Sequence, residues 1–262
     1  MQITVCIKQV PGTAEVEIDE KTGVLKREGI DSKMNPYDLY AIETAIRIKK
    51  EKTDSVNVIS MGPPQAEAVI REAYMMGADN GYLLTDRKFA GADVLATAYA
   101  LSQGIRTMGN SDIIICGKMT TDGDTAQVGP EIAEYLEIPH VANVRRIHEI
   151  SKKSIVVEMN MAESVEIQEV LLPCLITVEK DIYPPRLPSF KLKLKTAGRP
   201  VKKITFNDLK DKNEKHYGLN GSPTQVLRIF PPEPNKTSER WKGSGEALSG
   251  RLAKKLHELK FI

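Results

Sequence analysis

The sequence predicts an α/β protein in which helices cover both faces of a parallel, doubly wound sheet. Over about the first 140 residues, short β-branched apolar runs alternate with longer segments whose apolar residues recur at helical spacing. Glycine- or proline-bearing segments follow three of these runs, at the strand ends where such sheets bind their ligands. Between residues 140 and 180 the helical spacing disappears, which predicts a series of further strands.

The predicted elements of the first part alternate regularly. In chain order we expect a strand at 3–7, a helix from Pro36, a strand at 56–61, a helix from Gln65, a strand at 82–84, a helix over 92–108, and a strand at 112–116 before a further helical pattern. The helix from Pro36 has proline at its first position, Asn35 at the N-cap and Asp38 near the third position. Helix capping explains these two polar residues as well as a ligand role does.

The segment from Gly117 to Pro130 carries the strongest functional signal. It joins a buried strand pattern to a helical pattern and is rich in glycine and small hydroxylated residues. Backbone N–H groups in such a loop can point at an anion, which the positive end of the following helix also attracts. Two other strand ends carry comparable segments, at 8–12 and 61–64. The sequence therefore predicts a nucleotide site at this edge of the sheet.

The second part of the chain has a different pattern. We expect strands at 141–150, 155–159, 165–170 and 174–178, with a turn at 151–154, as an antiparallel extension of the same sheet. From 183 to 200, prolines surround Phe190 and an alternation of lysine and leucine. This composition predicts an exposed loop or a partner-docking arm.

The C-terminus is expected to be separate from this domain. Residues 232–245 are rich in proline, glycine, serine and charge, which is typical of a linker. An amphipathic helix follows over 246–262, with Leu248, Leu252, Leu256 and Leu259 on one stripe. That stripe needs a surface, and we favour a partner subunit over the chain's own domain. The expected domains are thus 1–225, which binds the nucleotide, and 226–262.

Composition excludes several classes of function. The net charge of +2 is too small to imply nucleic acid, and the basic stretch over 191–203 is read as a solvated face. No run of about 18 apolar residues predicts a membrane span. The N-terminus enters a strand pattern directly, without the features of a signal peptide, so we expect a cytoplasmic protein.

The titratable side chains suggest no catalytic or metal site. Cys6, Cys116 and Cys174 each lie in an apolar strand-like run, which predicts buried reduced thiols and neither disulfides nor a metal cluster. The four histidines are scattered, without the spacing of a hydrolytic or metal-dependent centre. If electrons pass through this protein, an organic cofactor must therefore carry them.

Four separated segments together resemble the β subunit of the electron-transfer flavoproteins. They are Val5 to Pro11, Asn35 to Asp38, Gly77 to Asp79, and Gly117-Lys118 leading to Asp122 to Gln127. The resemblance covers roughly residues 1–190 and depends on all four segments occurring in the same order. It implies a Rossmann-like, adenine-nucleotide-binding sheet and a heterodimer with an α subunit that holds FAD.

The loop from Asp122 to Gly129 resembles the electron-bifurcating branch of this family residue by residue. In that branch the β subunit binds a complete FAD, and the conventional branch has bulkier acidic residues where this chain has Gly123 and Thr125-Ala126. The resemblance implies that NADH reduces FAD held by this chain, which passes electrons to ferredoxin and to the FAD of the α subunit. Amides from Thr125 to Val128 can meet a diphosphate at the helix start.

The same resemblance implies which residues bind the cofactor. They are Cys6, Lys8, Asn35, Pro36, Tyr37, Asp38, Met61, Gly117, Lys118, Asp122, Gly123, Asp124, Thr125, Ala126, Gln127 and Val128, of which Cys6 and Met61 are expected to act through their backbone atoms. For each of them simple packing is the alternative. Mg²⁺ binding by Asp122 and Asp124 is less favoured than a role in orienting the loop, so no metal site is expected.

The chain departs from the family in two places, and both concern the partner. Residues 159–164 replace an acidic, glycine-rich turn, and the arm around Leu187, Pro188, Phe190 and Lys191 differs from the arm that docks acyl-CoA dehydrogenases. A flavin dehydrogenase of the lactate or 2-hydroxy acid type is therefore an alternative to an acyl-CoA type. Two other readings of the chain stay open: a β subunit with structural AMP, and a regulatory module that binds ATP or AMP without redox chemistry.

Overall fold

A computed structural model describes residues 1–12, 32–227 and 238–262 of the chain, which fall into two compact units. The larger unit contains the described residues up to 227 and the smaller one residues 238–262. The predicted boundary at 225/226 lies close to this division. Residues 232–237 of the predicted linker lie outside the described residues. The two-domain organisation stays a prediction.

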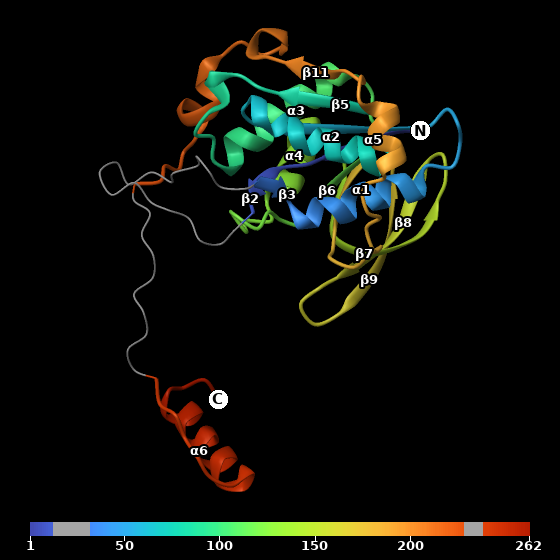
Figure 1. Cartoon of the computed structure of the whole chain (residues 1–262). Helices are drawn as coiled ribbons and strands as arrows, with labels where there is room; N and C mark the ends of the chain where they lie inside the picture. Colours follow the sequence, from blue (N-terminus) through green and yellow to red (C-terminus); the bar gives the residue numbers. More distant parts are fainter. Residues whose placement is uncertain (13–31, 228–237) are drawn as a thin grey trace. The chain divides into compact units, whose positions relative to one another are not determined.

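The larger unit is built on one nine-stranded sheet (Figure 1). Its order is β11 (Val201–Ile204), β5 (Asn80–Leu84), β4 (Ser55–Met61), β1 (Gln2–Cys6), β6 (Ile113–Gly117), β10 (Cys174–Val178), β7 (His140–Ile150), β8 (Ser154–Asn160) and β9 (Val165–Leu171). Every pair from β11 to β7 is parallel, and β7, β8 and β9 pair antiparallel. The predicted α/β fold class is confirmed.

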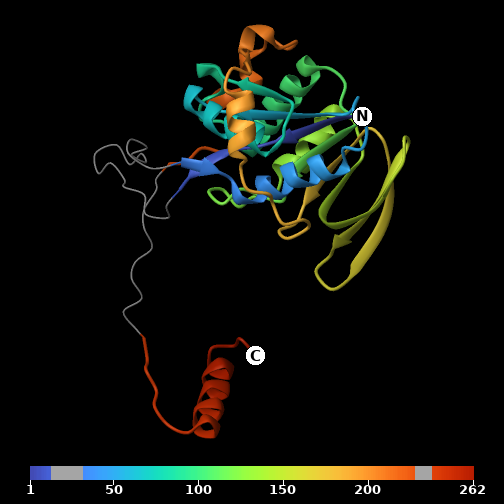
Figure 2. The ribbon, with the colours of Figure 1, turned by 45° about the vertical axis from the view of Figure 1, so that its right-hand side comes forward.

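Helices pack on both faces of the sheet and enclose two apolar clusters. On one face lie α1 (Pro36–Ile48) and α2 (Glu67–Met76), with α5 (Phe190–Thr196) packed on α2; on the other lie α3 (Val94–Met108) and α4 (Val128–Leu136). The strands between them are buried on both sides, which explains their continuous β-branched sequences. Figure 2 shows β8 and β9, in yellow, at one edge of this layered unit.

Shorter elements complete the larger unit. They are the antiparallel pair β2 (Gln9–Pro11) and β3 (Ser32–Met34) and the 3₁₀ turns η1 (Pro64–Ala66), η2 (Arg87–Phe89), η3 (Phe206–Asp208), η4 (Glu214–His216) and η5 (Gly218–Gly221). The sequence pattern did not predict β2, β3 or β11. Each has only three or four residues, too few for the periodicity of a strand to be recognised.

Two expectations for the second part of the chain need correction. Residues 174–178 do not belong to the antiparallel extension, because β10 lies between β6 and β7 and is parallel to both. All five of its residues are buried, as suits a central parallel strand. The arm over 183–200 is not only a loop, since Ser189 caps the helix α5 through a 3.3 Å hydrogen bond from Leu192 N to its Oγ.

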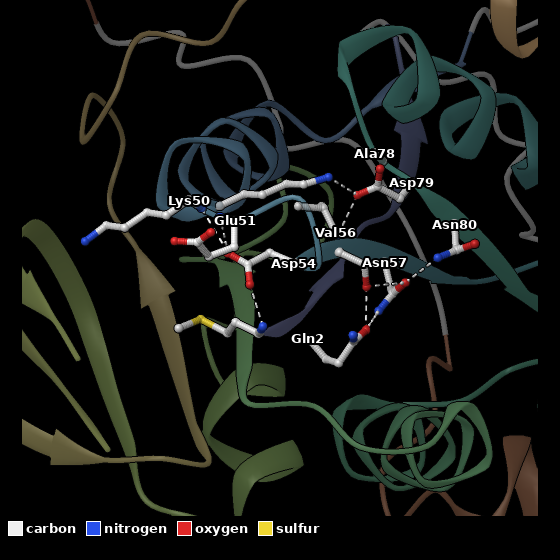
Figure 3. Close-up of polar contacts among 12 residues, drawn as sticks. Gln2, Lys50, Glu51, Asp54, Val56, Asn57, Ala78, Asp79 and Asn80 are labelled. Atoms are coloured by element: carbon white, nitrogen blue, oxygen red, sulfur yellow. Dashed lines mark hydrogen bonds and ion pairs between the residues drawn. The ribbon is translucent and has the colours of Figure 1, made fainter. Parts of the chain in front are cut away.

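Polar side chains at the amino ends of the strands fix their register, as Figure 3 shows. Asp54 accepts hydrogen bonds from the α-amino group of Met1 and from the amides of Lys50 and Glu51. Asp79 accepts from Val56 N and Lys49 Nζ, each at 2.8 Å. Because these contacts lie at the amino ends of the strands, they leave the opposite edge of the sheet available to other groups.

The smaller unit is one helix and the segment before it. The helix α6 covers Gly245–Glu258, close to the predicted range, and Ser244 caps it. The guanidinium of Arg251 lies 4.5 Å from the ring centre of Trp241, and Lys255 pairs with Glu239 at 3.0 Å. Leu252 and Leu259 remain half exposed. Among the described residues, no helix has the length and apolar composition needed to cross a membrane.

Candidate nucleotide site

Three strand-end segments meet at the carboxyl edge of the sheet. Because β1 lies between β4 and β6 and is parallel to both, the segments after these strands leave the same edge side by side. They begin at Ile7, Gly62 and Lys118, whose amides donate to carbonyl groups of the neighbouring strands at 2.9 to 3.1 Å. The predicted site residues of these segments are thereby brought together.

Asn35 connects two of these segments. Its side chain is fully buried, and Nδ2 donates to Asp38 Oδ1 and to Met119 O, both at 2.9 Å. Its Oδ1 accepts from Thr121 N at 3.2 Å. Asn35 does stand at the N-cap of α1, but its side chain makes no capping hydrogen bond. Side-chain capping is therefore the wrong explanation for Asn35, which instead holds the segment after β6.

Asp38 lies beneath the same segments and is 4% exposed. Its Oδ2 accepts from Lys8 N at 2.7 Å, its Oδ1 accepts from Asn35 Nδ2 at 2.9 Å, and Gly117 adjoins Oδ1. Burial raises the pKa of Asp38 to about 7, against the opposing effect of these hydrogen bonds and of the Lys8 charge. Asp38 thus joins the ends of β1 and β6 to the first turn of α1.

Gly117 is required by this arrangement. A Cβ atom there would lie 2.6 Å from Asp38 Oδ1 and 2.7 Å from the carbonyl carbon of Tyr37. Pro36 and Tyr37, both half buried, form the first turn of α1 at this contact. Their position explains why a helix start and a glycine occur together in the site.

The segment after Asp122 forms an open, donor-rich loop. Asp124 and Ala126 have φ values of 49° and 55°, in the left-handed region, and alternate with residues of other conformation. Such alternation turns successive N–H groups toward one side, which creates a concave anion site. The helix α4 begins at Val128, and no side chain caps its N-terminus. Residues 121–127 are all exposed, and among their amides those of Thr121 and Asp124 are already engaged, by Asn35 Oδ1 and Thr120 O.

The space beside Gly123 in the loop is open. A Cβ atom on Gly123 would meet only Thr120 Oγ1, at 3.4 Å, so protein atoms do not fill the space beside it. Gly129 holds the start of α4 against the sheet, since a Cβ atom there would lie 2.6 Å from Thr177 Cγ2. Free amides at a helix N-terminus and the absence of bulk at Gly123 both fit a phosphate group.

Two lysines of the site are engaged differently. Lys8 Nζ pairs with both carboxylate oxygens of Asp122, at 2.8 and 2.9 Å. Lys118 Nζ pairs with Glu179 Oε1 at 2.8 Å. The sequence analysis missed Glu179, which follows β10 directly, because that strand was not expected next to β6. Asp122 pairs with Lys8, and its role in orienting the loop stays a prediction.

Two of the three thiols, those of Cys6 and Cys116, lie under the site. Cys6 and Cys116 are register partners on β1 and β6 and are buried on the same face of the sheet. A hydrogen bond with Cys6 and burial together raise the pKa of the Cys116 thiol, and burial raises the pKa of Cys174 to about 12. All three cysteines are free. Met61 is half buried at the end of β4.

The predicted docking residues lie elsewhere. Leu187 and Phe190 are 87% and 72% exposed, and Pro188 and Lys191 adjoin them at the start of α5. Ser189 N donates to Met75 O near the end of α2, which is the amino edge of the sheet. The arm and the nucleotide site are therefore separate surfaces. Within the described ranges, no group of three or more His, Cys, Asp or Glu side chains could hold a metal ion.

Comparison with known proteins finds one family that matches most of the chain. A family model described as electron transfer flavoprotein domain matches residues 22–209. The chain is 48% identical to the electron transfer flavoprotein subunit beta of Thermoanaerobacterium thermosaccharolyticum over 259 residues, 98% of each chain. It is 43% identical to the caffeyl-CoA reductase-Etf complex subunit CarD of Acetobacterium woodii, over 95% of this chain and 92% of CarD. The chain is 40% identical to Protein FixA of Sinorhizobium fredii, over 90% of this chain and 85% of FixA.

The raised pKa of Asp38 predicts a pH dependence of stability. Between about pH 4 and pH 7 the folded state retains a proton on Asp38 that the unfolded state has lost, so the free energy of unfolding should fall as pH rises. In Asp38→Asn this part of the dependence should disappear. Urea denaturation from pH 4 to 8 measures it, with Asp181→Asn, an exposed carboxylate at the same edge, as the control. Parallel curves for wild type and Asp38→Asn would contradict the prediction.

Proposed function

The chain belongs to the electron transfer flavoprotein family as a β subunit, and on this basis we propose that it is the NADH-oxidising subunit of an electron-bifurcating member. It would work as a heterodimer with an α subunit. Bound FAD would accept hydride from NADH and supply electrons to ferredoxin and to a second FAD in the α subunit. The residues of this chain would bind and position that FAD.

The open loop over 122–129 carries the proposal. Its residues leave space at Gly123, and its two left-handed residues favour a conformation in which neighbouring amides face one side. We propose that the amides of Thr125, Ala126, Gln127 and Val128 bind the diphosphate of FAD. Asp124 is proposed to shape the loop through its left-handed backbone, whereas Asp122 acts through its ion pair.

The other residues of the site would position the cofactor. Asn35 and Asp38 hold the ends of β1 and β6 in a fixed relation, with Pro36 and Tyr37 supporting them. The side chain of Cys6 is buried, so it would contribute through its backbone, and Met61 is proposed to do the same. Lys118, Gly117 and Lys8 complete the set that we propose to line the site.

The names of the relatives support a larger complex. CarD is named as a subunit of a caffeyl-CoA reductase-Etf complex. By analogy, we propose that this chain and its α subunit serve a flavin dehydrogenase of the acyl-CoA or of the lactate and 2-hydroxy acid type. The exposed arm with Leu187, Pro188, Phe190 and Lys191 is the proposed docking surface for it. The half-exposed leucines of α6 are proposed to dock on the α subunit.

Two alternatives have less support. In a conventional β subunit the site would hold AMP with a structural role, and the space at Gly123 would remain unused. In a regulatory module of another class the same sheet would bind ATP or AMP without redox chemistry. The exposed arm and the apolar stripe of α6 disfavour the second alternative, because a stand-alone nucleotide sensor needs neither surface.

The nucleotide content of the purified heterodimer tests the proposal. Denaturing extraction followed by chromatography should give two FAD per heterodimer and no AMP. The α subunit expressed without this chain gives the reference value of one FAD. One FAD with one AMP in the heterodimer would identify the conventional β subunit instead.

The steric argument at the loop has its own test. Gly123→Asp combined with Ala126→Cys adds bulk and charge at the space that we assign to FAD, and it should lower FAD occupancy of this chain severalfold. Gly198→Ala, where a Cβ atom meets nothing within 4 Å, is the matched control. Flavin absorbance per heterodimer measures the effect. Equal flavin content in both variants would refute the argument.

A further inference from the structure

The geometry points to an exchange of counter-ions at Lys8: we propose that its ammonium group binds the phosphate of the nucleotide, and that Asp122 holds this group until the phosphate replaces it. The proposal rests on the nucleotide site described above. It concerns the phosphate alone, so it applies equally to the monophosphate of AMP and to the diphosphate of FAD.

The backbone of Lys8 is fixed beside the loop. Its N–H donates to Asp38 Oδ2 at 2.7 Å, and its carbonyl oxygen accepts from Asn35 N at 2.9 Å. Both partners are buried polar residues of the first turn of α1. Because the main chain is held on both sides, the ammonium group can move only within the reach of its own side chain. That reach includes Asp122, at the start of the donor-rich loop.

The ion pair between Lys8 and Asp122 is suited to exchange. The two side chains are 44% and 32% exposed. Pairs of this kind contribute little to stability, because solvent screens them and two long side chains must be ordered. A phosphate offers more negative charge and stronger acceptors than one carboxylate.

Lys118 cannot make the same exchange. Its partner Glu179 is only 15% exposed, compared with 32% for Asp122. Removing Lys118 would leave a carboxylate that is largely buried and uncompensated, which costs far more than breaking a surface pair. Of these two lysines at the carboxyl edge, Lys8 is therefore the one whose charge is available to a ligand, and Lys118 is committed to the fold.

Asp122 consequently opposes binding in one respect. It competes with the phosphate for Lys8, although it also keeps the ammonium group close to the loop. A residue that only held the loop in shape would promote binding. The two roles predict opposite effects of Asp122→Asn on nucleotide affinity, which makes the exchange testable.

The experiment measures AMP and FAD affinity of heterodimers that have been stripped of nucleotide, by equilibrium dialysis at two salt concentrations. Lys8→Met should weaken the affinity for both nucleotides about 10- to 100-fold, because one charge-assisted hydrogen bond is lost. It should also reduce the dependence of affinity on salt concentration. Lys8→Arg should retain most of the affinity. Asp122→Asn should leave the affinity unchanged or raise it about threefold. Lys180→Met removes an exposed charge from the same edge and serves as the control.

Adenosine, which lacks a phosphate, separates the phosphate from the rest of the nucleotide. Its binding should be equal in wild type and Lys8→Met. The proposal is overturned if Lys8→Met binds AMP and FAD as well as Lys180→Met does, or if Asp122→Asn weakens binding as Lys8→Met does. Should Lys8→Met fail to fold, Asp122→Asn and Lys8→Arg still decide. None of these outcomes depends on whether extraction yields FAD or AMP, so the two proposals fail independently.

Discussion

The hydrogen bonds of Asn35 and Asp38 hold the carboxyl edge of this protein together. Two polar side chains in the first turn of one helix bind the segments after two different strands. In the low dielectric of the interior such bonds are strong when complete, and a missing partner is costly. The loop that begins at Gly117 can stay open to solvent because this buried network fixes its first residues.

The same constraint explains the division of the site into a rigid and an exposed part. Between Gly117 and Thr121 the chain is held against Asn35 and Asp38, and no side chain fits at Gly117. From Asp122 to Gln127 the chain is exposed, includes two left-handed residues and leads to an uncapped helix start. The amides of a helix end without a side-chain cap are satisfied by another group, either water or a ligand. Binding a phosphate is a physical reason for that arrangement.

The sequence allowed the parallel strands and the exposed loop between β6 and α4 to be predicted, because both depend on local patterns. It was less informative where a residue's partners are distant. Asn35 looked like a capping residue since only its neighbours are visible in sequence, whereas Met119 and Thr121 are far along the chain. The run Cys174–Val178 indicates a buried strand but not its direction. The alternation of lysine and leucine after Phe190 did not indicate a helix. These residues nevertheless form α5, which packs on α2.

Amide hydrogen exchange in Asn35→Ala, in the heterodimer, tests most directly whether this network holds the edge. The account predicts much faster exchange at Thr121, which loses its acceptor, and at Lys8 and Gly117, which Asp38 then holds less firmly. Ile115, in the middle of β6, should keep its wild-type protection. Unchanged exchange at Thr121 and Lys8 would show that the edge is held by other contacts and would contradict the account.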